Sequence, residues 1–234
     1  SNRGASLLNI GRVKDAIKCF RKALDQNPQH LEALHNLGVA YAAQKQYEKA
    51  LECFDRTIAG DPDLYAAYCG KSEVLSALQR YDQAIQVSRD ATRLDGNEPT
   101  AYADMGFAYL KLGRFEDSIK AYDRAASLQD RSNETARLHA LALSELAVLC
   151  EKKRDYHKAI QFNSKSIQRY ETPMALHNLG VLYVGEGQPV KAKSSFSKAL
   201  KLDPRYFPTN AALGVLSAQE GNLASAMRFL SQAH

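Results

Sequence analysis

The sequence has no long hydrophobic run, and its N-terminus lacks a basic stretch followed by an apolar one. A membrane-spanning helix needs roughly 18 or more apolar residues, and a secretory signal needs that N-terminal pattern. We therefore predict no membrane span. Cysteine is scarce as well, with four residues in the chain. Cys19, Cys53, Cys69 and Cys150 form no CxxC pair and have no regular metal-ligand spacing. Reduced thiols in the cytoplasm, or alternatively in the nucleus, are expected.

Long stretches of one charge are also missing. The 31 Lys and Arg residues outnumber the 26 Asp and Glu residues, but they are scattered and form no basic stripe interleaved with aromatics of the kind that binds nucleic acid. The sequence contains no Gly-rich phosphate loop, nucleophile elbow or metal-ligand cluster. We predict that the chain is not an enzyme, holds no cofactor or metal, and does not bind nucleic acid.

What the sequence does contain is a repeated amphipathic pattern, in a chain that is 45% apolar and 24% charged, as folded proteins are. Residues 31–64 show the pattern best. Apolar and small residues recur there every three or four positions in two stretches, which are Leu34, Leu37, Gly38 and Tyr41, and then Tyr47, Ala50, Leu51, Phe54 and Ile58. This spacing predicts two antiparallel helices joined by a short turn. The second helix is expected to end at Asp61 and Pro62.

The same marks return with a period of 34 residues. Small residues stand at the eighth and twentieth positions, an aromatic at the twenty-fourth and proline at the thirty-second, as in Gly4, Ala16, Phe20 and Pro28 and in Gly180, Ala192, Phe196 and Pro204. This pattern resembles the tetratricopeptide repeat family. The resemblance implies an all-α fold, a right-handed α-solenoid (superhelix) of antiparallel helix pairs.

We expect a single solenoid over residues 1–234. Its copies are 1–30 (partial), 31–64, 65–98, 99–132, 140–172, 173–206 and 207–234 (partial), and the insertion 133–139 extends the first helix of the copy that follows it. Ser132 or Asn133 is suited to cap that helix. Ser88 and Asn163 stand where an aromatic belongs, which predicts weaker local packing. Since the first and last copies are incomplete, we expect a fragment of a longer repeat array or of a multidomain protein.

The resemblance also implies that the first helices line a concave groove with positions 2, 5, 6, 9 and 12 of each copy. These positions carry no Lys or Arg, and they are acidic in the middle of the chain. The predicted partner-binding residues are Asn36, His35, Glu73, Asp104, Phe107, Glu145, His177 and Asn178. An amide at position 6 can donate to and accept from the main chain of an extended peptide. The alternatives are a solvated face for the carboxylates and asparagines, and inter-repeat packing for Phe107.

The predicted function is a protein-interaction scaffold that binds an extended or helical segment of a partner protein, neutral or basic in charge. Family members that dock the acidic C-termini of chaperones need a set of Lys, Arg and Asn that no register here supplies, so we predict no such role. Asn36 and Asn178 resemble the asparagines in the repeats of O-linked N-acetylglucosamine transferases. The alternatives are therefore the substrate-recognition arm of a multidomain enzyme, or a subunit of a transport or ciliary assembly.

Overall fold

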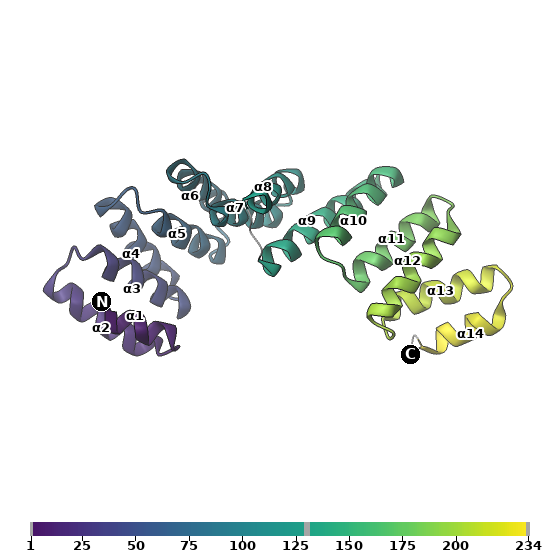
Figure 1. The fold of residues 1–234 in the computed structure, drawn as a ribbon, viewed down its shortest axis with the longest axis horizontal. Helices are drawn as coiled ribbons and strands as arrows, with labels where there is room; N and C mark the ends of the chain where they lie inside the picture. The colour runs from purple at the N-terminus through teal and green to yellow at the C-terminus, as the bar shows by residue number, and fades with distance from the viewer. Residues whose placement is uncertain (1, 129–131, 233–234) are drawn as a thin grey trace. The chain divides into compact units, whose positions relative to one another are not determined.

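The computed structural model describes residues 2–128 and 132–232, and all regular structure in these ranges is α-helical (Figure 1). The helices there are α1 (Asn2–Asn9), α2 (Val13–Gln26), α3 (Leu31–Ala43), α4 (Tyr47–Gly60), α5 (Tyr65–Ala77), α6 (Tyr81–Leu94), α7 (Pro99–Lys111), α8 (Phe115–Ser127), α9 (Asn133–Lys152), α10 (Tyr156–Arg169), α11 (Pro173–Gly185), α12 (Pro189–Leu202), α13 (Phe207–Gln219) and α14 (Leu223–Gln232). The predicted all-α solenoid of helix pairs is confirmed. None of these helices has the length and apolar character that crossing a bilayer requires.

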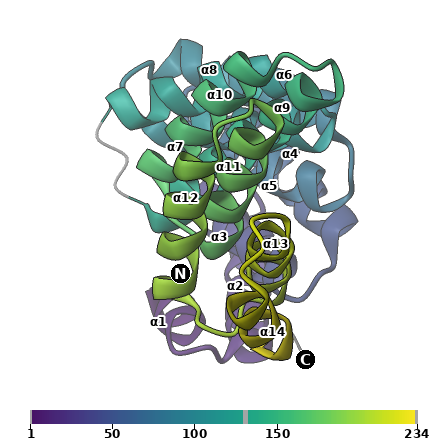
Figure 2. The ribbon, with the colours of Figure 1, turned by 90° about the vertical axis from the view of Figure 1, so that its right-hand side faces the viewer.

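The helices pair as hairpins of consecutive elements and fall into two compact units. Unit 1, residues 1–130, contains the hairpins α1–α2, α3–α4, α5–α6 and α7–α8. Unit 2, residues 131–234, contains α9–α10, α11–α12 and α13–α14. The two helices of the last hairpin lie side by side in both ribbon views (Figures 1 and 2). One continuous solenoid over residues 1–234 stays a prediction.

Each hairpin turns through one residue in the left-handed region. Glycine serves in four hairpins, with φ between 72° and 78°, and Lys45, Gln79 and Arg154 serve in the other three, with φ between 58° and 60°. A non-glycine residue costs about 1 kcal/mol there. In the α3–α4 turn the cost is offset because the amide of Gln46 donates to the Tyr41 carbonyl at 2.9 Å.

The helices of several hairpins approach closely because glycine faces an aromatic ring. A Cβ placed on Gly38 would lie 2.9 Å from Phe54, and one placed on Gly106 would lie 2.8 Å from Tyr122. Such separations are shorter than real carbon contacts, so these positions accept only glycine without a shift of the ring. Phe54 is 1% exposed and Tyr122 is fully buried. The small residue at position 8 and the aromatic at position 24 therefore form one contact.

The two degenerate copies keep their hairpins by other means. The hydroxyls of Ser72 and Ser88 lie 2.6 Å apart, and Ser72 donates to the Ala84 carbonyl at 3.3 Å. In the α9–α10 hairpin the hydroxyls of Ser144 and Ser166 lie 2.9 Å apart, and Ser166 donates to the Ala140 carbonyl at 2.8 Å. Asn163 is 1% exposed and joins this hairpin to the next one by donating from Nδ2 to the Ala175 carbonyl of α11 at 2.7 Å. Buried polar groups are tolerated when they are hydrogen-bonded, so the fold continues through both copies.

The first helix of unit 2 is longer than the other complete first helices. Helix α9 has 20 residues, against 13 in α3, α5, α7, α11 and α13. It begins at Asn133, and the Ser132 hydroxyl caps it by accepting from the Thr135 amide at 3.4 Å. The seven-residue insertion thus lies in the helix and leaves the α9–α10 hairpin intact.

Candidate functional site

The first helices of unit 1 contact one another in sequence, α3 with α5 and α5 with α7, and so form a continuous surface. We call the residues at positions 2, 5, 6 and 9 of these helices the first-helix face. It comprises Glu32, His35, Asn36, Val39, Ala66, Cys69, Gly70, Glu73, Thr100, Ala103, Asp104 and Phe107, all of them exposed or partly exposed. The face therefore remains accessible to a ligand.

Asp104 on α7 and Glu73 on α5 come together on this face. Asp104 is partly buried, and burial followed by the charge of Glu73 raises the pKa of its carboxyl to about 7. Neither carboxyl has an ion-pair partner among the residues that the structure describes. The nearby charge of Glu73 adds to burial in disfavouring the ionised form of Asp104. A carboxyl with a raised pKa on an accessible face marks a candidate functional site.

Two residues that the sequence interpretation did not select for binding, Tyr65 and Cys69, lie beside this pair, and only Cys69 was placed on this face by its repeat position. Tyr65, Cys69 and Glu73 are four residues apart along α5, so they share one side of the helix. The Tyr65 hydroxyl accepts the Ala101 amide of α7 at 3.0 Å and ties the two helices together. Burial raises the pKa of the Cys69 thiol to about 12, so it stays protonated and is not a nucleophile. The spacing alone could have revealed both residues.

The two predicted histidines pack against aromatic rings. His35 is half-buried, with its ring centroid 5.6 Å from that of Phe54, and its Nδ1 has no hydrogen-bond partner among the described residues. His177 on α11 lies 5.5 Å from the Phe196 ring, and its Nδ1 is 3.1 Å from the Thr209 hydroxyl. Burial lowers the pKa of both histidines. Both are therefore neutral at physiological pH, and their role as partner contacts stays a prediction.

The remaining predicted residues are divided between the units. Asn36 lies on α3 in unit 1, whereas Asn178 lies on α11 and Glu145 on α9 in unit 2. Both asparagines are partly exposed, and neither side-chain amide makes a hydrogen bond within the described part of the chain. Phe107 lies on α7 with the Lys111 ammonium 5.2 Å from its ring centroid. Of the predicted acidic residues, Glu73 and Asp104 thus lie together on the first-helix face of unit 1, whereas Glu145 lies in unit 2.

A cavity of about 250 Å³ opens between α3 and α5 on the same face. We call it the Gly70 pocket, and its lining residues are Val39, Ala42, Ala43, Tyr47, Phe54, Gly70, Glu73, Val74 and Ala77. Phe54 and Val74 are each 1% exposed and form the floor, while Ala43, Glu73 and Ala77 are exposed at the rim. Glu73 therefore belongs both to the carboxyl pair and to this pocket.

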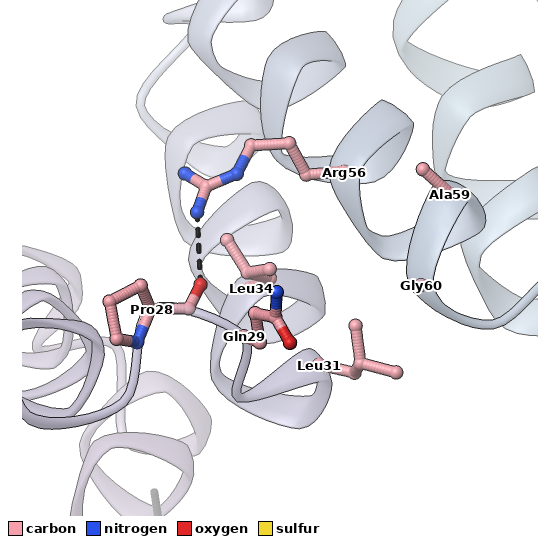
Figure 3. Close-up of a pocket in the computed structure, with 7 residues that line it drawn as sticks. All are labelled: Pro28, Gln29, Leu31, Leu34, Arg56, Ala59 and Gly60. Carbon is pink, nitrogen blue, oxygen red and sulfur yellow. Dashed lines mark hydrogen bonds between the residues drawn. The ribbon is translucent and has the colours of Figure 1, made fainter.

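A second cavity of about 510 Å³ lies where the α2–α3 connection meets the end of α4 (Figure 3). Arg56 reaches across from α4 and donates to the Pro28 carbonyl at 3.0 Å. Arg124 makes the equivalent bond to the Gly96 carbonyl at 3.3 Å. Because the bond recurs between successive copies, Arg56 links repeats. In the described ranges no group of three His, Cys, Asp or Glu side chains could hold a metal ion.

Sequence comparisons agree with the repeat architecture. Family models described as tetratricopeptide repeat match residues 2–64, 46–99, 97–172 and 173–206. The chain is 27% identical over 229 residues to BBSome complex member BBS4 of Bos taurus, which covers 97% of the chain and 43% of that protein. It is 24% identical over 147 residues to TPR repeat-containing protein MJ1428 of Methanocaldococcus jannaschii, covering 62% and 26%. The chain thus spans less than half of each relative.

Solved structures with low sequence identity share the fold. The C-terminal part of a TPR repeat-containing protein from Cytophaga hutchinsonii matches with a TM-score of 0.79 at 13% identity, covering 99% of this chain and 93% of that one. YrrB, described as a TPR protein with an unusual peptide-binding site, matches with a TM-score of 0.63 at 20% identity, covering 82% and 96%. With the family matches over residues 2–206, these similarities show that the chain belongs to the tetratricopeptide repeat family.

Proposed function

We propose that the first-helix face of unit 1 binds an extended, basic or neutral segment of a partner protein, and that the chain contributes no chemistry of its own. The observation that carries the proposal is the carboxyl pair, Glu73 and Asp104, which has no cation beside it in the described structure. A cationic ligand would offset the charge of Glu73 at Asp104 and favour the ionised form of the Asp104 carboxyl. An acidic segment would add further negative charge beside the two carboxyls.

Two further features support an extended ligand. The amide of Asn36 lies on the same face and makes no hydrogen bond within the described structure, so it is available to a peptide main chain. Each such bond contributes about 0.5–1.5 kcal/mol. The charges contribute mainly to association rate and register, and ordering an extended segment offsets part of the contact energy. We therefore expect micromolar affinity.

The second candidate function is that of a subunit in a multiprotein assembly. It is favoured by the similarity to a BBSome complex member, which extends over 97% of the chain. The two functions are compatible, since an assembly subunit can hold a neighbouring segment on its first-helix face. Purification of the full-length protein from its own cells, followed by mass measurement of the native complex, separates an assembly subunit from a protein that binds peptides only transiently.

Fluorescence anisotropy with three labelled peptides tests the first proposal. In these peptides serine alternates with lysine, with glutamine or with glutamate, and the titration is run at about pH 8, above the pKa of Asp104. The Lys–Ser peptide should bind best. The double substitution Glu73→Gln and Asp104→Asn should weaken it about fivefold to tenfold, since each partly exposed ion pair contributes about 0.2–1 kcal/mol.

The matched control is Glu48→Gln with Glu52→Gln, which removes the same charge from exposed positions on α4. The control should bind like the wild type, and Asn36→Ala should weaken all peptides that bind. Equal weakening by both double substitutions would show unspecific charge attraction and contradict the proposal. Preference for the Glu–Ser peptide would contradict it as well.

A further inference from the structure

We propose that the Gly70 pocket binds one basic side chain, lysine or arginine, of the partner segment. The proposal rests on the proposed function and adds to it the subsite that selects the residue. The pocket is lined by α3, α4 and α5, all within unit 1. Its rim carries Glu73, one of the two carboxyls of the pair, so a segment that lies along the first-helix face passes over its mouth.

Gly70 lines the pocket with backbone alone, because position 70 has no side chain. The ring of Phe54 lies beneath it, and a Cβ placed on Gly70 would be 2.6 Å from the Phe54 Cζ atom. The preceding copy carries Asn36 at the same position of the repeat. Where the asparagine series is broken by glycine, the backbone of the face therefore lies directly on a buried aromatic ring.

The chemistry of the lining selects a long side chain with a charged end. Val39 and the rim alanines offer apolar surface above the buried side chains of Phe54 and Val74, and Glu73 is the carboxylate among the lining residues. Lysine and arginine combine an aliphatic stem with a terminal cation. A water occupies about 30 Å³ of liquid, so a cavity of about 250 Å³ has the volume of about eight waters. That is sufficient for one such side chain.

Two other cavities of unit 1 fit a basic side chain less well. The cavity in Figure 3 contains the Arg56 guanidinium, which would repel a second cation. A cavity of about 360 Å³ between α4 and α6 is lined by Arg80 and by Lys71, whose ammonium already pairs with Asp55 at 2.6 Å. In the Gly70 pocket the carboxylate of Glu73 has no such partner in the described structure.

Titration with the n-butylguanidinium ion, which reproduces an arginine side chain, tests the pocket directly by amide NMR. Its neutral analogue n-butylurea is the reference probe. We expect saturable shifts at Gly70, Glu73 and Ala77, with binding of the cation about fivefold tighter than that of the urea. Glu73→Gln should abolish this difference. Ala77→Leu fills the pocket from its exposed rim and should abolish the shifts, whereas Ala59→Leu, in the cavity of Figure 3, should not.

The outcomes separate this proposal from the proposed function. Shifts that survive Ala77→Leu, that appear around Arg56 instead, or that are equal for the two probes would overturn the pocket assignment. Lys–Ser peptides that still bind the Ala77→Leu variant with unchanged affinity would also overturn it, while the first-helix face would remain the peptide site. If butylguanidinium binds the pocket but no peptide binds the protein, the proposed function fails and the pocket remains a site for the cation alone.

Discussion

The neighbouring hairpins α3–α4 and α5–α6 have helices of the same lengths but are closed by different chemistry. In the first, the backbone at Gly38 meets the buried ring of Phe54. In the second, the hydroxyls of Ser72 and Ser88 are hydrogen-bonded 2.6 Å apart. A close helix contact thus tolerates either packed apolar surface or a satisfied polar pair, because both avoid a void and an unpaired buried group.

The choice of aromatic ring or serine at position 24 also affects position 6 of the following copy, which lies on the first-helix face. The large ring of Phe54 leaves room only for Gly70 at position 6 of the next copy. Ser88 occupies the position equivalent to Phe54, and the residue equivalent to Gly70 is the partly buried Asp104. In one case the result is an apolar pocket, and in the other a carboxyl with a raised pKa. The interior of one repeat and the binding surface of the next are therefore not independent.

The largest effect is expected from Phe54→Ala, which removes the ring that packs against Gly38, Gly70 and His35. Loss of a fully buried Phe costs about 3–5 kcal/mol of the free energy of unfolding. The matched change Ser88→Ala should cost about 1 kcal/mol, the net value of a hydrogen bond. Urea denaturation, with hydrogen exchange to locate the loss in α3–α5, provides the measurement. Equal costs for the two variants would contradict the distinction between the hairpins.

The next largest effect on stability is expected when the residues that join the two helices of one hairpin are replaced by those of the other. Ser88→Phe places a ring against the Ser72 side chain and should destabilise the α5–α6 hairpin by about 1–3 kcal/mol, the usual cost of overpacking. Combining it with Ser72→Gly recreates the glycine–aromatic contact and should recover most of that loss. The free energies of unfolding of both variants decide the point. A double variant no more stable than Ser88→Phe would show that the two chemistries are not interchangeable at this position.

The smallest effect on stability is expected from the Asp104 carboxyl, which follows the hairpin joined by Ser72 and Ser88. The pKa of Asp104 is raised from 3.8 to about 7, so the folded state binds the proton more tightly than the unfolded state between these values. Its stability contribution is therefore present below about pH 4 and is lost as the pH rises through 7. Asp104→Asn should remove this slope and stabilise the protein at about pH 8 by about 1–2 kcal/mol, a figure reduced for partial exposure.

Thermal unfolding of wild type and Asp104→Asn at several pH values between about 4 and 8 provides the measurement. The exposed Asp82→Asn on α6 is the control and should leave the slope as it is. A slope that persists in Asp104→Asn would assign the titration to another group, with Glu73 the first to examine because its charge acts on Asp104.

Much of the architecture could be predicted from the sequence. The period of 34 residues and the small residues at fixed positions predicted the helix pairs, and the run without Gly or Pro after Ser132 predicted a lengthened helix where α9 lies. These features depend on residues close together in the chain. The site was harder to predict, since repeat positions placed Cys69, Glu73 and Asp104 on one face but did not show the Tyr65 contact to α7 or the pocket beside Gly70.

By itself the sequence determined the helices, their hairpins and the acidic character of the first-helix face, because spacing within a helix fixes which side chains share a side. Only the tertiary structure decided how the copies interact. The ring of Phe54 reaches both its own hairpin and the next copy, the Tyr65 hydroxyl ties α5 to α7, and burial changes the pKa of Asp104. These properties depend on distances between residues of different helices, which packing sets and a local pattern does not contain.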